Sequence, residues 1–283
     1  MRPTNIVIAV AALAIISVAT LAIFVAQQPA LAGPLEDGQA ALESGDYATA
    51  LAKLRPLAVA GNPMAQFSLG NMYLIGQGVT RDDAQAVFWY RKAAEQGDAG
   101  AQRNLGFMYA NGQGVTQDYA QALSWYRKAA EQGDAGAQLN LGNMYANGQG
   151  VTQDHAQAVF WYRKAAGQGD AGAQLNLGFM YGNGQGVTQD YAQALSWYRK
   201  AAGQGNAGAQ NNLGVMYADG QGVTQDYVQA HKWFNLAASK LKATDDREKA
   251  ARSRDIVAAK MTPAQIAEAQ RLASVWKPTG PQP

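Results

Sequence analysis

The sequence predicts an all-α solenoid built from helix hairpins, and three observations support this prediction. A 36-residue pattern that begins at Ala65 starts again, without a linker, at Ala101, Ala137, Ala173 and Ala209. Within each copy, apolar residues recur at the spacing of a helix. A pair of glycines interrupts each copy once, near its middle. A unit this short buries its apolar face only against its neighbours, so the copies must stack into one elongated array.

Composition argues against several classes of function. The 283 residues carry a net charge of +2 with 16% charged residues, which leaves no basic stripe for nucleic acid. The absence of cysteine excludes disulfides, thiol-rich metal sites and a lipid attached through cysteine. His155 and His231 stand where other copies have unrelated residues, which predicts surface positions rather than metal ligands or a general base. We therefore expect no enzyme activity, no cofactor and no metal.

Residues 1–32 are typical of a membrane-targeting segment. Residues 6–26 are apolar or small and follow Arg2. Ala30 to Ala32 fits a secretory cleavage site after Ala32, whereas about twenty apolar residues are also enough for an uncleaved signal anchor. Both alternatives place the remaining chain outside the cytoplasm. The expected location is therefore the bacterial periplasm, with the protein either secreted or anchored in the inner membrane by residues 6–26.

Residues 33–64 are predicted to form a divergent N-terminal capping repeat. Asp46 and Ala50 precede Asp82 and Ala86 by 36 residues, so this segment aligns with the second half of a repeat. Departure from the common pattern is expected in a terminal unit, because one of its faces must meet water. Pro56 should bend or interrupt the second helix of this unit.

Each repeat is predicted to contain two helices, as residues 65–100 illustrate. The first helix ends at Gly76, the first of the two glycines that supply backbone freedom. Either Thr80 or Asp82 is placed to cap the second helix, which runs to about Gln96.

A glycine in the middle of the first helix needs a compensating contact. Gly70 and its equivalents should each cost about 1 kcal/mol relative to alanine. We expect a Trp or Tyr of the second helix to pack over the missing side chain, and the repeated aromatic residues to form the core. The glycines are Gly70, Gly106, Gly142, Gly178 and Gly214, and the tryptophans are Trp89, Trp125, Trp161, Trp197 and Trp233.

The repeat resembles a known family. Ala-Gln-x-x-Leu-Gly-x-Met-Tyr, followed by Gly-x-Gly-Val and Trp-Tyr-Arg-Lys-Ala-Ala, is similar to the Sel-one-like repeat, a relative of the tetratricopeptide repeat. The resemblance covers residues 65–244 and gives five repeats. It implies a right-handed superhelix of antiparallel helix pairs, whose concave face is lined by first helices and binds other proteins. Relatives with a disulfide in each repeat differ from this cysteine-free chain, so their activities do not transfer to it.

Comparison of the five copies identifies a variable stripe. The third and seventh positions of the first helix differ between copies, whereas the packing positions are fixed, and the tenth position continues the same stripe. By the resemblance, this stripe faces the concave side. The predicted partner-binding residues are Phe67, Asn71, Leu74, Arg103, Phe107, Leu139, Asn143, Leu175, Phe179, Asn211 and Val215. Hydrogen bonds between successive repeats are expected from the adjacent asparagines, which are Asn104, Asn140, Asn176 and Asn212.

The repeats also alternate in type. Asn71 and Asn143 occupy the seventh position in one type, and Phe107 and Phe179 occupy it in the other. Compensating packing or duplication of a 72-residue block would both produce this alternation. We favour duplication.

Residues 245–276 are predicted to close the array with two capping helices. The first is charged and amphipathic. The second begins with Thr262 as N-cap, Pro263 in the first turn and Gln265 as capping-box partner. Residues 277–283 are predicted to be a disordered tail.

The sequence therefore predicts an exported, non-enzymatic scaffold that binds an extended segment or loop of another protein, as an adaptor in the bacterial envelope. Two alternatives remain open: a module that binds peptidoglycan or another cell-wall glycan, and an envelope hydrolase. Nucleic acid is not an expected partner. Membrane contact is expected only through an uncleaved N-terminal segment.

Overall fold

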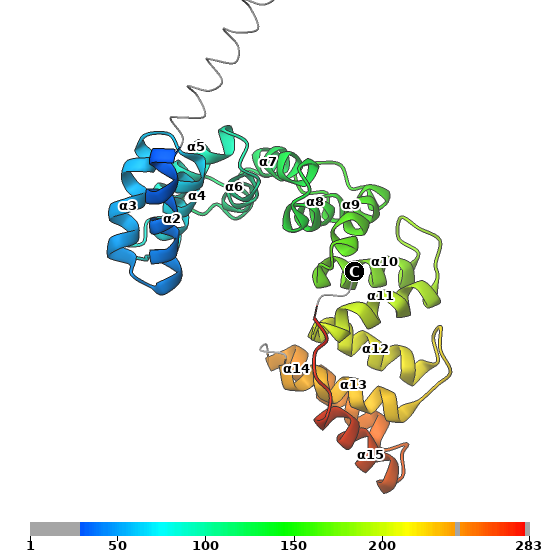
Figure 1. Cartoon of the computed structure of the whole chain (residues 1–283). Helices are drawn as coiled ribbons and strands as arrows, with labels where there is room; N and C mark the ends of the chain where they lie inside the picture. Colours follow the sequence, from blue (N-terminus) through cyan, green and yellow to red (C-terminus); the bar gives the residue numbers. More distant parts are fainter. Residues whose placement is uncertain (1–28, 241–243, 281–283) are drawn as a thin grey trace, which may run out of the picture. The chain divides into compact units, whose positions relative to one another are not determined.

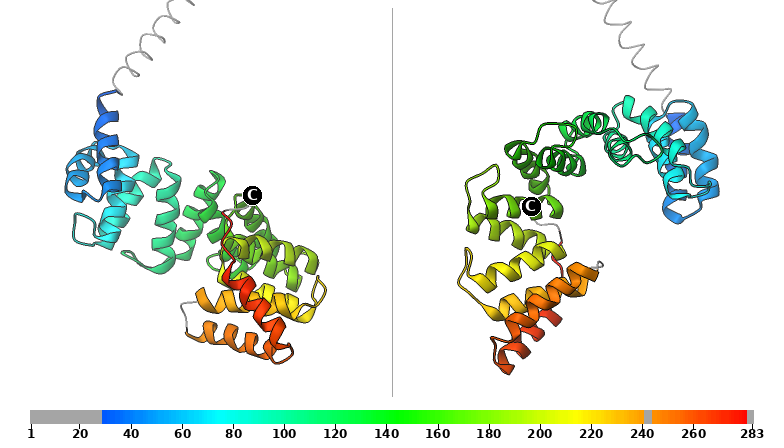
Figure 2. Two further views of the ribbon diagram at one scale, coloured as in Figure 1. Left: turned by 60° about the horizontal axis from the view of Figure 1, so that its bottom comes forward. Right: turned by 180° about the vertical axis from the view of Figure 1, so that it is seen from behind.

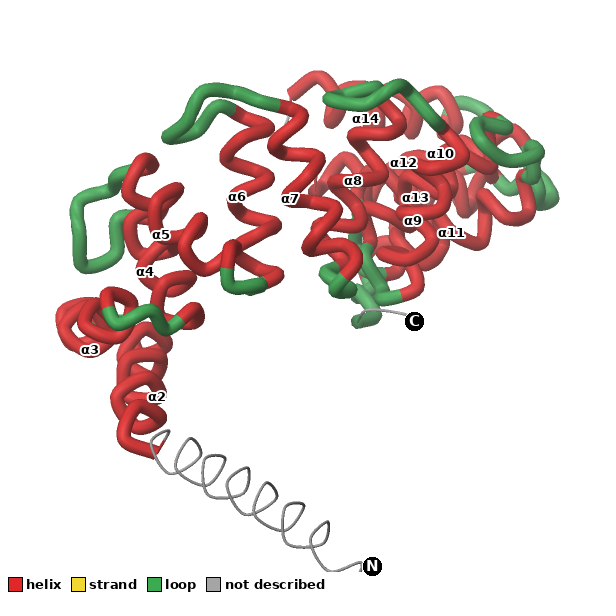
Figure 3. Tube along the Cα trace, turned by 90° about the horizontal axis from the view of Figure 1, so that it is seen from above, coloured by secondary structure: helices red, strands yellow, loops and turns green. Residues whose placement is uncertain are grey.

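The computed structural model describes residues 29–240 and 244–280, and within them it contains helices, turns and loops but no strand (Figure 3). This confirms the predicted all-α class. The predicted targeting residues 6–26 lie outside the described residues. In the described part, no helix combines the length and apolarity needed to cross a membrane. The chain divides into two compact units, Met1–Gln117 and Asp118–Pro283.

The first unit is a row of helix hairpins (Figure 1, blue to cyan). Its helices are α2 (Pro29–Ser44), α3 (Tyr47–Val59), α4 (Pro63–Ile75), α5 (Asp83–Glu95) and α6 (Ala99–Asn111). The pair α2 and α3 stands in the place of the predicted capping repeat, and α3 continues through Pro56 without interruption. The predicted break is therefore wrong. Ala52, one turn earlier, is exposed like Pro56, so water can replace the hydrogen bond that proline cannot donate.

The second unit repeats the hairpin and ends in two further helices. Its helices are α7 (Tyr119–Glu131), α8 (Ala135–Asn147), α9 (His155–Gly167), α10 (Ala171–Asn183), α11 (Tyr191–Gly203), α12 (Ala207–Asp219), α13 (Tyr227–Lys240), α14 (Thr244–Ala258) and α15 (Pro263–Ser274). The hairpins are α8 with α9, α10 with α11 and α12 with α13, and each packs on the next. Both α14 and α15 pack against α13 (Figure 2).

Local sequence determines where the helices begin and end. Asp82, not Thr80, caps α5, because its Oδ1 accepts a hydrogen bond of 2.9 Å from the Gln85 backbone N–H. Gly76 ends α4 with a left-handed φ of 82°. Gly78 is needed for a second reason: a Cβ there would lie 2.7 Å from the carbonyl oxygen of Tyr47. The loop therefore lies tightly against the preceding hairpin.

The mid-helix glycines make the expected close contacts, and the aromatic partner is Tyr rather than Trp. A Cβ on Gly70 would lie 2.6 Å from the Tyr90 ring, and a Cβ on Gly142 would lie equally close to Tyr162. In the last repeat Phe234 takes this place against Gly214. The tryptophans are less uniform than predicted. Trp89 and Trp161 are buried, but Trp125, Trp197 and Trp233 are only half-buried.

A glutamine that is the same in every repeat joins successive hairpins. Gln174 is fully buried; its Nε2 donates to the Ala166 carbonyl at 3.3 Å, and its Oε1 accepts from Gln204 Nε2 at 2.9 Å. Gln204 also donates to the Gly169 carbonyl at 2.9 Å. The same arrangement links Gln138 and Gln168. These amides satisfy buried backbone groups where one repeat meets the next.

The C-terminal capping box is confirmed, because Thr262 and Gln265 exchange the two expected hydrogen bonds. Beyond α15, Trp276 packs edge-on against Trp233, with 6.2 Å between ring centroids. The Thr279 backbone N–H donates to the Gly203 carbonyl at 2.9 Å. The first part of the predicted disordered tail thus lies against α11, and residues 281–283 lie outside the described residues.

His231 corrects a second prediction. Its side chain is only 3% exposed, whereas the sequence indicated a surface position. Burial lowers the pKa of His231, and the positive charge of Arg254 lowers it further, while Asp255 raises it. Replacement by Val or Leu in other repeats reflected an apolar position rather than an exposed one.

Candidate partner-binding surface

All the predicted partner-binding residues lie on first helices: α4 and α6 in the first unit, and α8, α10 and α12 in the second. Only Phe107, Phe179 and Val215 are exposed, at 47%, 48% and 37%. The half-buried members are Phe67, Asn71, Leu74, Arg103, Leu139, Asn143, Leu175 and Asn211. The stripe is therefore accessible in places and engaged in the fold in others.

The third helix position packs on the following repeat. A Cβ on Gly172 would lie 3.1 Å from the Leu139 side chain, and a Cβ on Gly208 would lie 3.2 Å from Leu175. Phe67 covers Gly100 in the same way and packs against Tyr90, with 6.0 Å between ring centroids. These side chains hold consecutive first helices together, a role that the variation between copies did not reveal.

Asparagine at the seventh position is bound within the protein. Asn71 Oδ1 accepts from the Tyr90 hydroxyl at 2.6 Å and from Asn104 Nδ2 at 3.4 Å. In the second unit, Asn143 Oδ1 accepts from the Tyr162 hydroxyl at 2.8 Å and from Asn176 Nδ2 at 3.0 Å. Asn104 and Asn176 therefore bond between successive repeats, as expected. Burial raises the pKa of both tyrosine hydroxyls to about 12.

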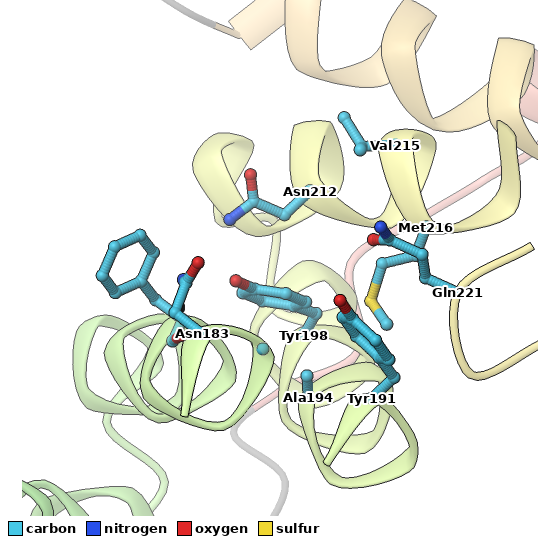
Figure 4. A pocket seen from close by; sticks show the side chains of 10 residues that line it. Asn183, Tyr191, Ala194, Tyr198, Asn212, Val215, Met216 and Gln221 are labelled. Carbon is cyan, nitrogen blue, oxygen red and sulfur yellow. Dashed lines mark hydrogen bonds between the residues drawn. The ribbon is translucent and has the colours of Figure 1, made fainter. Parts of the chain in front are cut away.

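Phenylalanine at the same position opens a pocket. Phe179 of α10 occupies the position that Asn143 has in α8. The Tyr198 hydroxyl therefore has no amide of the seventh position to bond with on α10. Burial raises the pKa of Tyr198 to about 12, against an opposing effect of the Asn212 amide. A pocket of about 240 Å³ lies between Phe179, Tyr198, Asn212 and Val215. Figure 4 shows the Tyr198 hydroxyl and the Asn212 amide facing the same space from α11 and α12.

A second pocket lies on the other side of Phe179. Its volume is about 310 Å³, and its lining includes Leu175, Phe179, Asn211 and Asn212. Asp246 and Lys249 of α14 complete it, with 3.4 Å between Asp246 Oδ1 and Lys249 Nζ. Phe179 and Asn212 line both pockets. We call the resulting continuous area, formed by Leu175, Phe179, Asn211, Asn212 and Val215, the Phe179 surface.

The Phe179 surface contains four of the eleven predicted residues together with Asn212. Among the other residues that line its two pockets and that the prediction missed, Tyr198 comes from a second helix, and Asp246 and Lys249 come from a capping helix. One signal could have identified Tyr198: Phe179 stands at the position of Asn143, the residue whose amide accepts from Tyr162. No internal repeat resembles α14, so Asp246 and Lys249 had no comparable signal.

The chemistry of this surface is that of recognition. The surface and its two pockets combine amides, the side chains of Tyr191 and Tyr198 and apolar side chains, with the Asp246–Lys249 ion pair at the edge. Neither His155 nor His231 lines the two pockets. Within residues 29–240 and 244–280, no group of three or more His, Asp or Glu side chains is arranged to hold a metal ion.

Tandem antiparallel hairpins with a partly exposed variable stripe define an α-solenoid of the type that binds other proteins. The chain belongs to the Sel1 repeat family, whose model matches residues 63–98, 99–134, 135–170, 171–206 and 207–240. The matches confirm the resemblance. They extend from residue 63 to residue 240, whereas the resemblance was predicted over residues 65–244.

A solved structure of 34% identity supports the same assignment. A Sel1 repeat protein from Oxalobacter formigenes is 34% identical, with a TM-score of 0.72 over 85% of this chain and 98% of that one. The protective antigen c5321 of uropathogenic Escherichia coli, which displays the same repeat fold, is 33% identical over 89% of this chain and 69% of that one, with a TM-score of 0.42. No curated protein matches this chain.

Proposed function

We propose that this protein is an exported, non-enzymatic scaffold in the bacterial envelope and that its Phe179 surface binds an extended segment or loop of another protein. The observation that carries the proposal is Phe179 itself. It is 48% exposed and stands between two pockets, at a position where the alternative residue, Asn143, is bonded within the fold.

The composition of the surface suits a polypeptide partner. The Asn211 and Asn212 amides offer donors and acceptors that match backbone N–H and C=O groups. Phe179 and Val215 offer apolar contact, which together with aromatic residues is typical of the centre of protein interfaces. A sugar could use the same amides and stack on the phenylalanine ring, so glycan binding is the competing outcome of the tests below.

The first test is Phe179→Asp with Phe160→Asp as its matched control. Phe160 is equally exposed, at 47%, but lies on the second helix α9. A charge at residue 179 should abolish capture of the partner protein, because it would have to be desolvated in the interface. Helical circular dichroism and melting temperature should change little in both variants. Equal loss of capture in the two variants, or unfolding of Phe179→Asp alone, would contradict the proposal.

The partner can be captured directly. A photoreactive phenylalanine analogue at residue 179, or at the equally exposed Phe107, should crosslink to a protein in cells, and mass spectrometry should identify one partner from both sites. The same analogue at residue 160 should give no such product. Retention of the protein on purified peptidoglycan, abolished by Phe179→Asp and without a crosslinked protein, would establish the glycan alternative instead.

The export part of the proposal rests on the apolar residues 6–26 and on Ala30 to Ala32. A fusion of alkaline phosphatase to the C-terminus should be active in a bacterial host and should lose activity when residues 1–32 are removed. The N-terminus of the purified protein would then distinguish cleavage after Ala32 from an uncleaved anchor. An inactive full-length fusion would refute export.

A further inference from the structure

The preceding repeat shows what kind of group the pocket beside Tyr198 can hold. In that repeat, the side-chain oxygen of Asn143 accepts hydrogen bonds from the Tyr162 hydroxyl at 2.8 Å and from Asn176 Nδ2 at 3.0 Å. We propose that the pocket beside Tyr198 binds the side-chain amide of an asparagine or glutamine in the partner segment. Because the pocket adjoins the Phe179 surface, this recognition rests on the proposed function and specifies the residue type that the surface selects.

Both hydrogen-bond donors of the preceding repeat have an equivalent at this pocket. Tyr198 and Asn212 stand 36 residues after the two donors of that repeat. Figure 4 shows the Tyr198 hydroxyl and the Asn212 amide turned toward the same space. The acceptor is replaced, because Phe179 stands 36 residues after Asn143. An amide oxygen supplied by a partner would therefore meet equivalent donors.

The pocket has room for such an amide. It has a volume of about 240 Å³, which corresponds to several water molecules. Val215 borders it at the position that Phe179 has one repeat earlier, so a smaller side chain leaves this space open. The site thus depends on two positions of the variable stripe, residues 179 and 215.

A primary amide also carries two N–H groups, which need acceptors when they are bound in a pocket. Asn183 lines this pocket, and its Nδ2 donates to the Phe179 carbonyl at 2.8 Å. The Asn183 Oδ1 therefore remains to accept from a ligand. Gln221 lines the pocket as well and offers a second amide oxygen. Donors and acceptors for the whole amide group thus border one space.

The burial of Tyr198 favours a side chain over a peptide carbonyl as the ligand. Tyr198 is only 6% exposed. A side-chain amide ends in the group to be bound and can enter the pocket end-on, whereas the chain continues on both sides of a peptide group. The described residues that line the pocket are all uncharged, so a carboxylate would lose hydration without gaining an opposite charge. Asparagine and glutamine therefore fit better than aspartate and glutamate.

Selection of peptides provides the first measurement. A phage-displayed library of random dodecapeptides is selected on the immobilised full-length protein. The selected peptides should share an asparagine or glutamine at one position. Fluorescence anisotropy then compares a fluorescein-labelled selected peptide with the same peptide carrying leucine at that position. The amide peptide should bind at least about fivefold more tightly, because the leucine peptide leaves the donors of the pocket unsatisfied.

The ratio of these two affinities is the quantity to compare between variants. Tyr198→Phe removes one donor and should lower the ratio at least about threefold. This variant should fold, because Phe234 takes the equivalent place against Gly214. Phe179→Asn supplies the acceptor of the preceding repeat from within the protein and should bring the ratio close to one. Its control, Phe160→Asn, adds an amide outside the pocket and should leave the ratio unchanged.

The possible failures separate this proposal from the proposed function. Peptides without a shared asparagine or glutamine, or an unchanged ratio in Tyr198→Phe, would overturn amide recognition alone if Phe179→Asp still abolishes binding. Selection of no peptide, or equal binding by Phe179→Asp, would contradict the proposed function and amide recognition with it. Binding of chitotriose that requires the Tyr198 hydroxyl would also overturn the proposal, because the ligand would then be an acetamido sugar.

Discussion

The contact between Gly142 and the Tyr162 ring shows how a single missing side chain shapes a repeat. The glycine lets the ring approach the backbone of α8 so closely that the Tyr162 hydroxyl reaches Asn143 at 2.8 Å. The helix-propensity penalty of about 1 kcal/mol for glycine is offset by the burial of an aromatic side chain. Packing and hydrogen bonding of the hairpin thus depend on the same position.

Gly142→Ala should therefore destabilise the protein although alanine is the better helix former. The new methyl group would lie 2.6 Å from ring carbons, and overpacking of this kind costs about 1–3 kcal/mol. Gly167→Ala is the control, because a Cβ there has nothing within 4 Å and should stabilise by about 0.5–1 kcal/mol. Thermal unfolding of both variants checks the opposite signs. A stabilising Gly142→Ala would show that the ring moves aside.

His231 makes stability depend on pH. Its pKa in the folded protein is lower than in the unfolded chain, where it is about 6.5, so the unfolded state binds the proton more readily. The contribution of His231 to stability is therefore fully present above about pH 6.5, and it is lost as the pH falls towards the lower pKa of the folded protein. His231→Leu restores the residue of earlier repeats and removes a buried, unpartnered Nδ1. It should stabilise by about 1 kcal/mol at pH 7.5 and by more at pH 5.

Urea unfolding of both proteins at the two pH values checks this expectation. Because the measured quantity is the difference between protein and variant, other titrating groups cancel. An equal difference at pH 5 and pH 7.5 would show that His231 is not protonated differently in the folded and unfolded states.

The sequence predicted individual residues best where they repeat. The Gly70 contact followed from a glycine placed where it is costly. The cap of the second helix was predicted as either Thr80 or Asp82, and the structure selects Asp82. His231 was misassigned because replacement by Val and Leu was taken as tolerance, whereas it reports an apolar environment. Asn71 and Phe67 were predicted to be free because they vary, yet both contact Tyr90. Variation between copies does not separate solvent contact from contact between repeats.

At the scale of helices, the buried glutamine is the element that joins one hairpin to the next. Gln174 bonds the last turn of α9 and the C-cap residue of α11 at once. This glutamine recurs in every copy, but the sequence predicts no role for it, because a polar residue beside apolar ones is equally typical of the edge of a helix face. Only the structure shows that the carbonyls of Ala166 and Gly169 accept their hydrogen bonds from the amides of Gln174 and Gln204.

Gln174→Leu should consequently cost about 1–3 kcal/mol, since it leaves the Ala166 carbonyl and the Gln204 amide without their partner. Gln193→Leu, at an exposed position on α11, should change stability by less than about 0.5 kcal/mol. Chemical denaturation distinguishes them. Equal stability of the two variants would mean that water replaces the buried amide.

At the scale of the whole molecule, stability is expected to be local, because each hairpin contacts mainly its neighbours. Trp276→Ala removes the contact with Trp233 and the ring beneath Lys240. Amide hydrogen exchange should therefore accelerate in α13 and α15 but not in α8 and α9. Uniform acceleration across the second unit would instead indicate a single cooperative block.

The architecture of the chain was predictable because the same helix pattern occurs in five copies. The structure of the chain ends was harder to predict. The Pro56 helix and the tail segment that reaches Gly203 depend on contacts made once, which no internal comparison could reveal. The Phe179 surface was predictable for the same reason as the architecture, because its residues lie on repeated helices. Asp246 and Lys249, which complete the second pocket, lie on α14, which has no repeated counterpart.

The Gln174 junction has an evolutionary consequence. Gln138 with Gln168, and Gln66 with Gln96, are bonded in the same way, so the contacts that close one boundary between hairpins also close another. Unequal recombination between copies can therefore insert or delete 36 residues at once without creating an unfamiliar interface. Such an event would change the length of the repeat array in steps of 36 residues, while the capping helices at its ends stay the same.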